Sequence, residues 1–238
     1  MTIGAVSSDL EGTGTTVKLE IVHFQAFSYV AEPLGVYFDD NNVVRDIASR
    51  IPNAIGGGDA LIAEGISRLC GGKASTEEIR QRKIDWYQRL VKEIKIEPRE
   101  GYLEVLRQIL ERKPPIPMAI ASLTERKQAE VLLEQSGIGL FFQPDFILLR
   151  DSVKNPKPAP DVYLEAARRM DVDPRHMLVF EDSVSGITAA RRAGCPVVAM
   201  PAFDFTEHIQ HIKDAGPVEI FMSWTEIDEA TLMALLNI

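Results

Sequence analysis

The chain has 238 residues, of which 45% are hydrophobic and 26% are charged. With a mean hydropathy of −0.04, this composition excludes a disordered chain and a protein built from membrane-spanning segments. The net charge of −9 argues against nucleic acid as a partner, because a phosphate backbone attracts basic surfaces.

The cysteines and the N-terminal segment indicate a reducing compartment. Cys70 and Cys195 form no Cys-x-x-Cys pattern, so we predict neither a disulfide framework nor a zinc site. The N-terminus carries no basic segment followed by an apolar run, and no window is long enough for a transmembrane helix. We therefore expect a cytoplasmic protein with no membrane partner.

Short apolar runs bounded by turn residues predict six strands, at 3–6, 116–121, 146–149, 177–180, 197–200 and 219–222. Such continuous runs suit strands that are covered on both faces of a sheet. Helical patterns separate them. Residues 126–135 predict a helix with a stop at Gly137, and 163–170 and 227–236 predict two more. This alternation predicts an α/β fold with a Rossmann-like parallel sheet.

The alternation is interrupted after the first strand, where helical patterns occur without a convincing pair of strands. Two glycine-containing breaks, Gly56-Gly57-Gly58 and Cys70-Gly71-Gly72, divide this stretch. We therefore predict two domains, a Rossmann-like core at 1–16 and 95–238 and an inserted all-helical cap at 17–94.

Polar side chains follow four of the predicted strands, at the edge of an open parallel sheet where ligands bind. In chain order the segments are Ser8-Asp9-Leu10-Glu11-Gly12-Thr13, Ser122-Leu123-Thr124, Asn155-Pro156-Lys157-Pro158-Ala159-Pro160 and Glu181-Asp182-Ser183. Together they suit phosphate transfer through an aspartyl phosphate. One carboxylate can attack phosphorus, other acidic groups can hold a hard cation, and a lysine and a hydroxyl can neutralise the transferring oxygens.

These segments resemble the four motifs of the haloacid dehalogenase superfamily, in order and spacing, over nearly the whole chain. The nearest resemblance is to the β-phosphoglucomutase-like branch, which inserts a helical cap after the first strand. The residues that carry it are Asp9-Leu10-Glu11-Gly12-Thr13, Ser122, Lys157-Pro158-Ala159-Pro160-Asp161 and Glu181-Asp182-Ser183 with Gly186.

The resemblance implies a role for each motif. Asp9 would be the nucleophile and a Mg²⁺ ligand, and Ser122 and Lys157 would hold the phosphoryl group. A helix cap is the alternative role for Ser122. Asp182 would bind Mg²⁺, and Glu181 would support it directly or through water.

Glu11 departs from the branch, which usually has Asp at this position. The implied metal contact comes from the backbone carbonyl and is unaffected. The side chain, which would serve as general acid and base, is one methylene longer. Poor reach would slow transfer, since general acid–base catalysis contributes roughly 10²–10⁴-fold. Enolase-phosphatases of the same superfamily carry Asp-x-Glu-Gly-Thr, so Glu11 is compatible with an active enzyme.

The resemblance further suggests five substrate contacts, His23, Gly57, Leu123, Thr124 and Arg126. Structural alternatives stay open: a packed cap residue for His23, a helix cap for Thr124 and a surface charge for Arg126. His208 and His211 are interpreted as solvated surface residues without a further metal ligand in register.

The cap sequence bears on the choice between phosphatase and mutase. His23-Phe24-Gln25-Ala26-Phe27 resembles the mutase stretch His-Phe-Arg-Ala-Trp. However, the mutase's cap arginine corresponds to Gly57, and its lysine after the second motif to Glu125. A second phosphate needs cations of this kind, so hydrolysis is favoured.

We therefore predict a Mg²⁺-dependent phosphatase that hydrolyses a small phosphate monoester, a sugar phosphate or similar metabolite, through an aspartyl phosphate on Asp9. Two alternatives stay open. One is a phosphosugar mutase of the β-phosphoglucomutase type, and the other is a catalytically weak phosphate-binding or interaction protein in which Glu11 cannot serve. Of the oligomeric states, the monomer is favoured.

Overall fold

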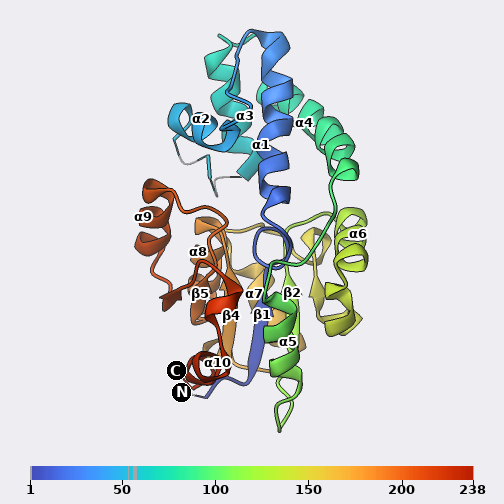
Figure 1. The fold of residues 1–238 in the computed structure, drawn as a ribbon, viewed down its shortest axis with the longest axis vertical. Helices are drawn as coiled ribbons and strands as arrows, with labels where there is room; N and C mark the ends of the chain where they lie inside the picture. The colour runs from blue at the N-terminus through green and yellow to red at the C-terminus, as the bar shows by residue number, and fades with distance from the viewer. Residues whose placement is uncertain (1, 53, 56–57, 238) are drawn as a thin grey trace. The chain divides into compact units, whose positions relative to one another are not determined.

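A computed structural model describes residues 2–52, 54–55 and 58–237 of the chain. The chain divides into two compact units (Figure 1). The first comprises Met1–Val17 and Ile96–Ile238, and the second comprises Lys18–Lys95. Each unit has a hydrophobic cluster of its own.

A six-stranded parallel sheet forms the centre of the first unit (Figure 1). Its strands are β1 (Ala5–Ser8), β2 (Met118–Ala121), β3 (Ile147–Leu148), β4 (Met177–Glu181), β5 (Val197–Ala199) and β6 (Glu219–Ile220). Their order in space is β3-β2-β1-β4-β5-β6, and all neighbouring pairs are parallel. The predicted α/β fold is confirmed, and each predicted strand overlaps an observed one.

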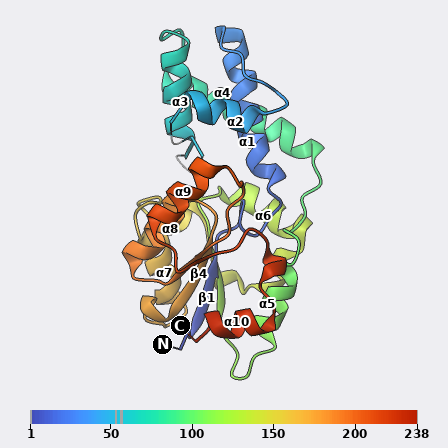
Figure 2. The same cartoon turned by 60° about the vertical axis from the view of Figure 1, so that its left-hand side comes forward.

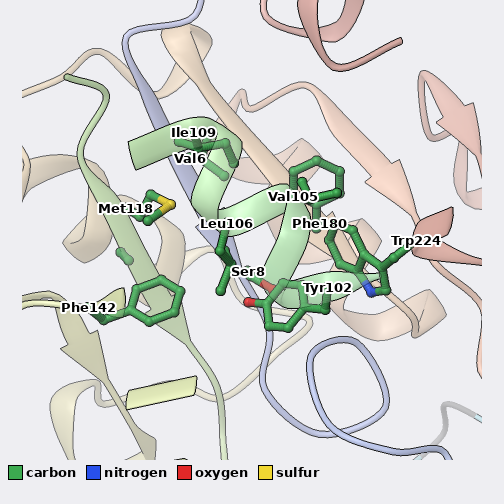
Figure 3. Close-up of a pocket in the computed structure, with 11 residues that line it drawn as sticks. Val6, Ser8, Tyr102, Val105, Leu106, Ile109, Met118, Phe142, Phe180 and Trp224 are labelled. Atoms are coloured by element: carbon green, nitrogen blue, oxygen red, sulfur yellow. The ribbon is translucent and has the colours of Figure 1, made fainter. Parts of the chain in front are cut away.

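Helices cover both faces of this sheet (Figure 2). On one face, Ala5 packs in a cluster with α7 (Asp161–Arg169) and α8 (Val184–Ala193). The next residue, Val6, lies on the other face against α5 (Tyr102–Leu110), as Figure 3 shows. Successive side chains of a strand point to opposite faces, so burial on both sides requires the continuous apolar runs seen in the sequence.

Helix boundaries in the first unit follow local chemistry. The helix α6 (Arg126–Ser136) ends at Gly137, whose φ of 72° suits a residue without a Cβ, so the predicted stop is confirmed. Pro160 lies immediately before α7, whose periodic apolar residues are buried. Two further helices, α9 (Thr206–Ala215) and α10 (Glu229–Leu235), follow β5 and β6.

The environment of His208, on α9, corrects a prediction. Its side chain is 4% exposed, and neither ring nitrogen has a hydrogen-bond partner among the residues the structure describes. Burial lowers the pKa of His208 to about 4. The interpretation of His208 as a solvated residue is therefore wrong. The sequence did not reveal that α9 turns this side chain inward, on the same side as the buried Ile212.

The second unit consists of helices in the part that the structure describes. They are α1 (Lys18–Ala31), α2 (Val43–Arg50), α3 (Gly58–Leu69) and α4 (Thr76–Leu90). One 3₁₀ segment (Glu32–Leu34) follows α1, and another (Val91–Glu93) follows α4. Val22 and Ala26 of α1 pack against Tyr87 of α4. Across the described parts of both units, no helix combines the length and apolarity needed to cross a membrane.

Candidate active site

Three buried carboxylates lie at the carboxyl ends of the two central strands. Asp9 follows β1, Glu181 is the last residue of β4, and Asp182 comes next. Counted over the whole residue, the exposed fractions of Asp9, Glu181 and Asp182 are 7%, 1% and 8%, respectively. The Asp9 N–H donates to the Phe180 carbonyl at 3.0 Å, which continues the ladder between β1 and β4. Parallel pairing thus brings together carboxylates from opposite ends of the sequence.

Lys157 connects these strands. Its ammonium group donates to Asp9 Oδ1 at 2.6 Å, to Glu181 Oε1 at 2.5 Å and to the Ala121 carbonyl of β2 at 3.0 Å. Burial raises the pKa of Asp9, and Lys157 opposes that change. Burial alone would lower the pKa of Lys157, but the charges of Asp9 and Glu181 raise it above its usual value. We therefore regard the lysine as protonated. Its charge favours the ionised form of Asp9, although burial raises the pKa of that carboxyl to about 7.

Protein donors surround the Glu181 carboxylate. Tyr163 donates to Oε1 at 2.8 Å, and the N–H and hydroxyl of Ser183 both donate to Oε2 at 3.1 Å. A Cβ at position 186, in the first turn of α8, would overlap this carboxylate, so glycine is required there. With these donors and Lys157 on its two oxygens, Glu181 is placed to orient the lysine.

The Asp182 carboxylate lies against the loop that follows β1. Thr13 donates to Asp182 Oδ1 at 2.8 Å. A Cβ at Gly12, where φ is +73°, would overlap the same carboxylate, so glycine is required both for the backbone and for the close approach. Three carboxyl groups, those of Asp9, Glu181 and Asp182, gather here beside the single ammonium group of Lys157. This excess of carboxylate oxygens fits a divalent cation with oxygen ligands.

Arg99 holds the same loop through hydrogen bonds to backbone carbonyls. Its guanidinium donates to four backbone carbonyls, at 2.9 Å to Gly12, 2.6 Å to Met200, 3.3 Å to Pro201 and 2.9 Å to Met222. It thus ties the loop after β1 to the ends of β5 and β6. Sequence reasoning missed Arg99, because its acceptors are backbone atoms that leave no signal in the residue types.

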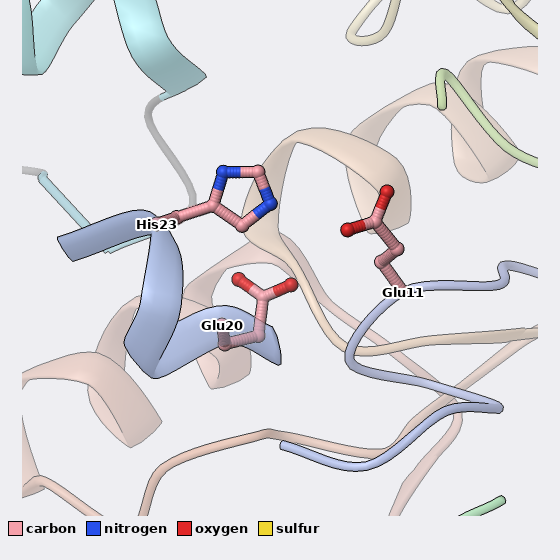
Figure 4. Close-up of side chains that lie close together, drawn as sticks. All are labelled: Glu11, Glu20 and His23. Atoms are coloured by element: carbon pink, nitrogen blue, oxygen red, sulfur yellow. The ribbon is translucent and has the colours of Figure 1, made fainter. Parts of the chain in front are cut away.

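Glu11 extends from the loop after β1 (Figure 4) and reaches the segment that follows β2. Thr124 donates to Glu11 Oε1 at 2.6 Å, and Gln128 of α6 donates to Oε1 at 3.0 Å and to Oε2 at 3.2 Å. The Ser122 hydroxyl lies 3.0 Å from that of Thr124. The N-cap of α6 is Glu125, so the alternative role of Ser122 as the cap of this helix is not observed.

Comparison with known proteins identifies the family. A family model described as haloacid dehalogenase-like hydrolase matches residues 3–194. The chain belongs to this family. The prediction of a hydrolase is therefore confirmed.

Three similar proteins refine the position of this hydrolase. A phosphorylated carbohydrates phosphatase of Thermotoga maritima is 30% identical over 80% of this chain and 81% of its own. Protein CbbY of Cereibacter sphaeroides is 28% identical over 94% of both chains. The solved structure of a putative β-phosphoglucomutase from Thermotoga maritima is 25% identical, covers 99% of this chain and 97% of its own, and has a TM-score of 0.67. The resemblance to the β-phosphoglucomutase-like branch is thereby confirmed.

In the second unit of this haloacid dehalogenase-like hydrolase, His23 is a packed residue. It follows Glu20 by one turn on α1 (Figure 4) and stacks on Tyr87, with 4.1 Å between ring centroids. Its Nδ1 lies 2.6 Å from the ammonium group of the buried Lys83, which also contacts Asp59 at 2.7 Å. The structural alternative for His23 is thus observed, and Lys83 is a partner that the sequence did not suggest.

The remaining predicted substrate contacts differ in their surroundings. Arg126 forms a bidentate pair with Asp151, at 2.7 and 2.9 Å, on the surface of the first unit. This pairing matches the alternative of a surface charge. Leu123 is half-buried between Ser122 and Thr124. Gly57 lies outside the described residues.

Proposed function

We propose that this hydrolase is a magnesium-dependent phosphatase that cleaves a small phosphate monoester through an aspartyl phosphate on Asp9. The observation that carries the proposal is the buried contact of Lys157 with Asp9, at the end of a central strand and beside the carboxylate of Asp182. A carboxylate fixed in this way can attack phosphorus, and the lysine can neutralise the transferring oxygens.

Mg²⁺ suits the donors at this site. Asp9, Asp182 and the backbone carbonyl of Glu11 would hold the ion. Glu181 would support the site indirectly, because it orients Lys157 and precedes Asp182. When bound, Mg²⁺ supplies positive charge that offsets the charge of the phosphoryl oxygens.

The side chains divide the reaction into two steps. In the first, a carboxylate oxygen of Asp9 forms a bond to phosphorus while the ester P–O bond breaks, and Glu11 gives a proton to the leaving alcohol. In the second, Glu11 takes a proton from water, whose oxygen attacks phosphorus and releases inorganic phosphate and the Asp9 carboxylate. Ser122 and Lys157 bind the phosphoryl oxygens in both steps.

A phosphorylated sugar is the proposed substrate class. The name of the Thermotoga maritima relative, a phosphorylated carbohydrates phosphatase, supports this class. The test is a panel of phosphomonoesters assayed for phosphate release with wild type, Asp9→Asn and, as a matched control, Asp85→Asn at an exposed position. We expect Asp9→Asn to lose roughly 10⁴-fold or more in kcat with an unchanged circular dichroism spectrum, and the control to retain full activity.

Two results would end this proposal. One is full turnover by Asp9→Asn, and the other is an undiminished rate in excess chelator, which would remove the metal from the reaction.

A phosphosugar mutase is the second candidate, supported by the similarity to a putative β-phosphoglucomutase. Phosphorus NMR of a sugar phosphate would then reveal isomerisation without phosphate release. No turnover by either wild type or Glu11→Asp would favour a phosphate-binding protein.

A further inference from the structure

Glu11 is held by two side chains that belong to neither the nucleophile nor the proposed metal site. Thr124 and Gln128 together place three hydrogen bonds on its carboxylate, and both Glu11 oxygens receive at least one. Thr124 is 8% exposed and Gln128 is half-buried, so these bonds are partly shielded from water. Hydrogen bonds to a charged group in such surroundings are stronger than those between neutral groups.

The length of the Glu11 side chain makes this support consequential. Glutamate has more rotatable bonds than aspartate and loses more conformational entropy when it is fixed. A general acid and base must nevertheless lie within hydrogen-bond reach of the atom whose proton it exchanges. Donors that fix the carboxylate reduce the number of side-chain orientations that it samples before each proton transfer.

The position of Gln128 suits this task. It is the third residue of α6. Its own backbone N–H donates to the Glu125 carbonyl at 3.0 Å, which anchors the first turn of the helix. One amide nitrogen of Gln128 reaches both Glu11 oxygens. Because the amide is neutral, it orients the carboxylate without forming an ion pair that the substrate would have to break.

We infer that Thr124 and Gln128 are positioning residues for Glu11, matched to the longer side chain at this position. This inference rests on the proposed function, and it gives Thr124 a role other than the substrate contact suggested by the sequence. Gln128 acts through Glu11, the side chain to which its amide donates. A shorter aspartate at position 11 would fail to reach both partners.

A double-mutant cycle tests this coupling. Gln128→Met and Thr124→Val, which keep shape and remove the donors, are each measured in the wild-type and Glu11→Asp backgrounds. In the wild-type background we expect kcat to fall about tenfold or more, with KM changed less than about twofold. In the Glu11→Asp background the same substitutions should change kcat less than about twofold. Gln135→Met, at an exposed position of α6, is the matched control and should retain wild-type activity.

Equal losses in both backgrounds, or no loss in the wild-type background, would overturn the inference. A second readout does not depend on turnover. The side-chain amide signals of Gln128 in a ¹⁵N–¹H spectrum should shift in Glu11→Asp and not in Glu134→Asp, an exposed residue of the same helix. Unmoved signals would also overturn the inference. If wild type hydrolyses nothing in the panel while the amide signals shift, the proposed function fails and the positioning contact stands.

Discussion

Replacing Lys157 with Met tests the electrostatics of the buried cluster. The ammonium group lies 2.6 Å from Asp9 and 2.5 Å from Glu181, and the three side chains are 5%, 10% and 1% exposed. Methionine fills much of the same volume but leaves two carboxylates without this cation. Removing one partner of a buried ion pair costs about 3–5 kcal/mol. Because two carboxylates lose the same partner, we expect the free energy of unfolding at pH 8 to fall by at least about 3 kcal/mol.

The loss should depend on pH with a definite sign. Lys157 opposes the effect of burial on the pKa of Asp9, so its removal raises that pKa further above the unfolded value. A group whose pKa is raised on folding adds stability below its unfolded pKa, and this stability is lost as the pH rises through the folded pKa. At about 1.4 kcal/mol for each unit of pKa, the difference between variant and wild type should be about 1–2 kcal/mol smaller at pH 5 than at pH 8.

Denaturant unfolding measures this difference. The fluorescence of the buried Trp224 reports on the first unit when Trp86, in the second unit, is replaced by Phe in every protein compared. A chelator prevents a divalent cation from replacing the lost ammonium charge. Lys154→Met, at an exposed position three residues away, is the control. A loss below about 1 kcal/mol at pH 8, or a loss that grows at pH 5, would refute the reasoning.

Three further substitutions test other contacts. Gly186→Ala places a Cβ in the Glu181 carboxylate, so kcat should fall about tenfold and the free energy of unfolding by about 1–3 kcal/mol. The control is Gly4→Ala, whose Cβ would meet its nearest atom at 3.4 Å and which should leave both quantities unchanged. Equal effects of the two substitutions would contradict the steric argument. Arg99→Met leaves four carbonyls without their donor, so the free energy of unfolding measured with denaturant should fall by about 2–4 kcal/mol. An unchanged free energy of unfolding would show that these contacts contribute little. Burial lowers the pKa of His208 to about 4, so between pH 6.5 and 4 the unfolded chain binds a proton more readily than the folded chain. Wild type should therefore lose up to about 3 kcal/mol of stability as the pH falls through this range, and His208→Phe should not. Parallel stability curves for the two proteins would contradict this assignment.

The sheet could be predicted from the sequence because its signals are local. A strand covered on both faces needs an unbroken apolar run, and each such run identified an observed strand. The parallel order then brings the strand ends to one edge, so Asp9 and Asp182 could be grouped before any contact was known. Lys157 was included through its motif, and the structure supplies the physical reason in its contacts with β1, β2 and β4.

What the sequence by itself determined is therefore the parallel α/β fold and the set of polar residues at the strand ends, since both follow from periodicity and chain order. The tertiary structure alone decided how those residues are held. Gln128 reaches Glu11 across 117 positions of sequence, and Arg99 binds backbone carbonyls from three separate segments. His208 is buried by the packing of α9, which its helical spacing could not reveal. Such contacts depend on which faces of distant elements meet, and residue types along the chain do not encode that directly.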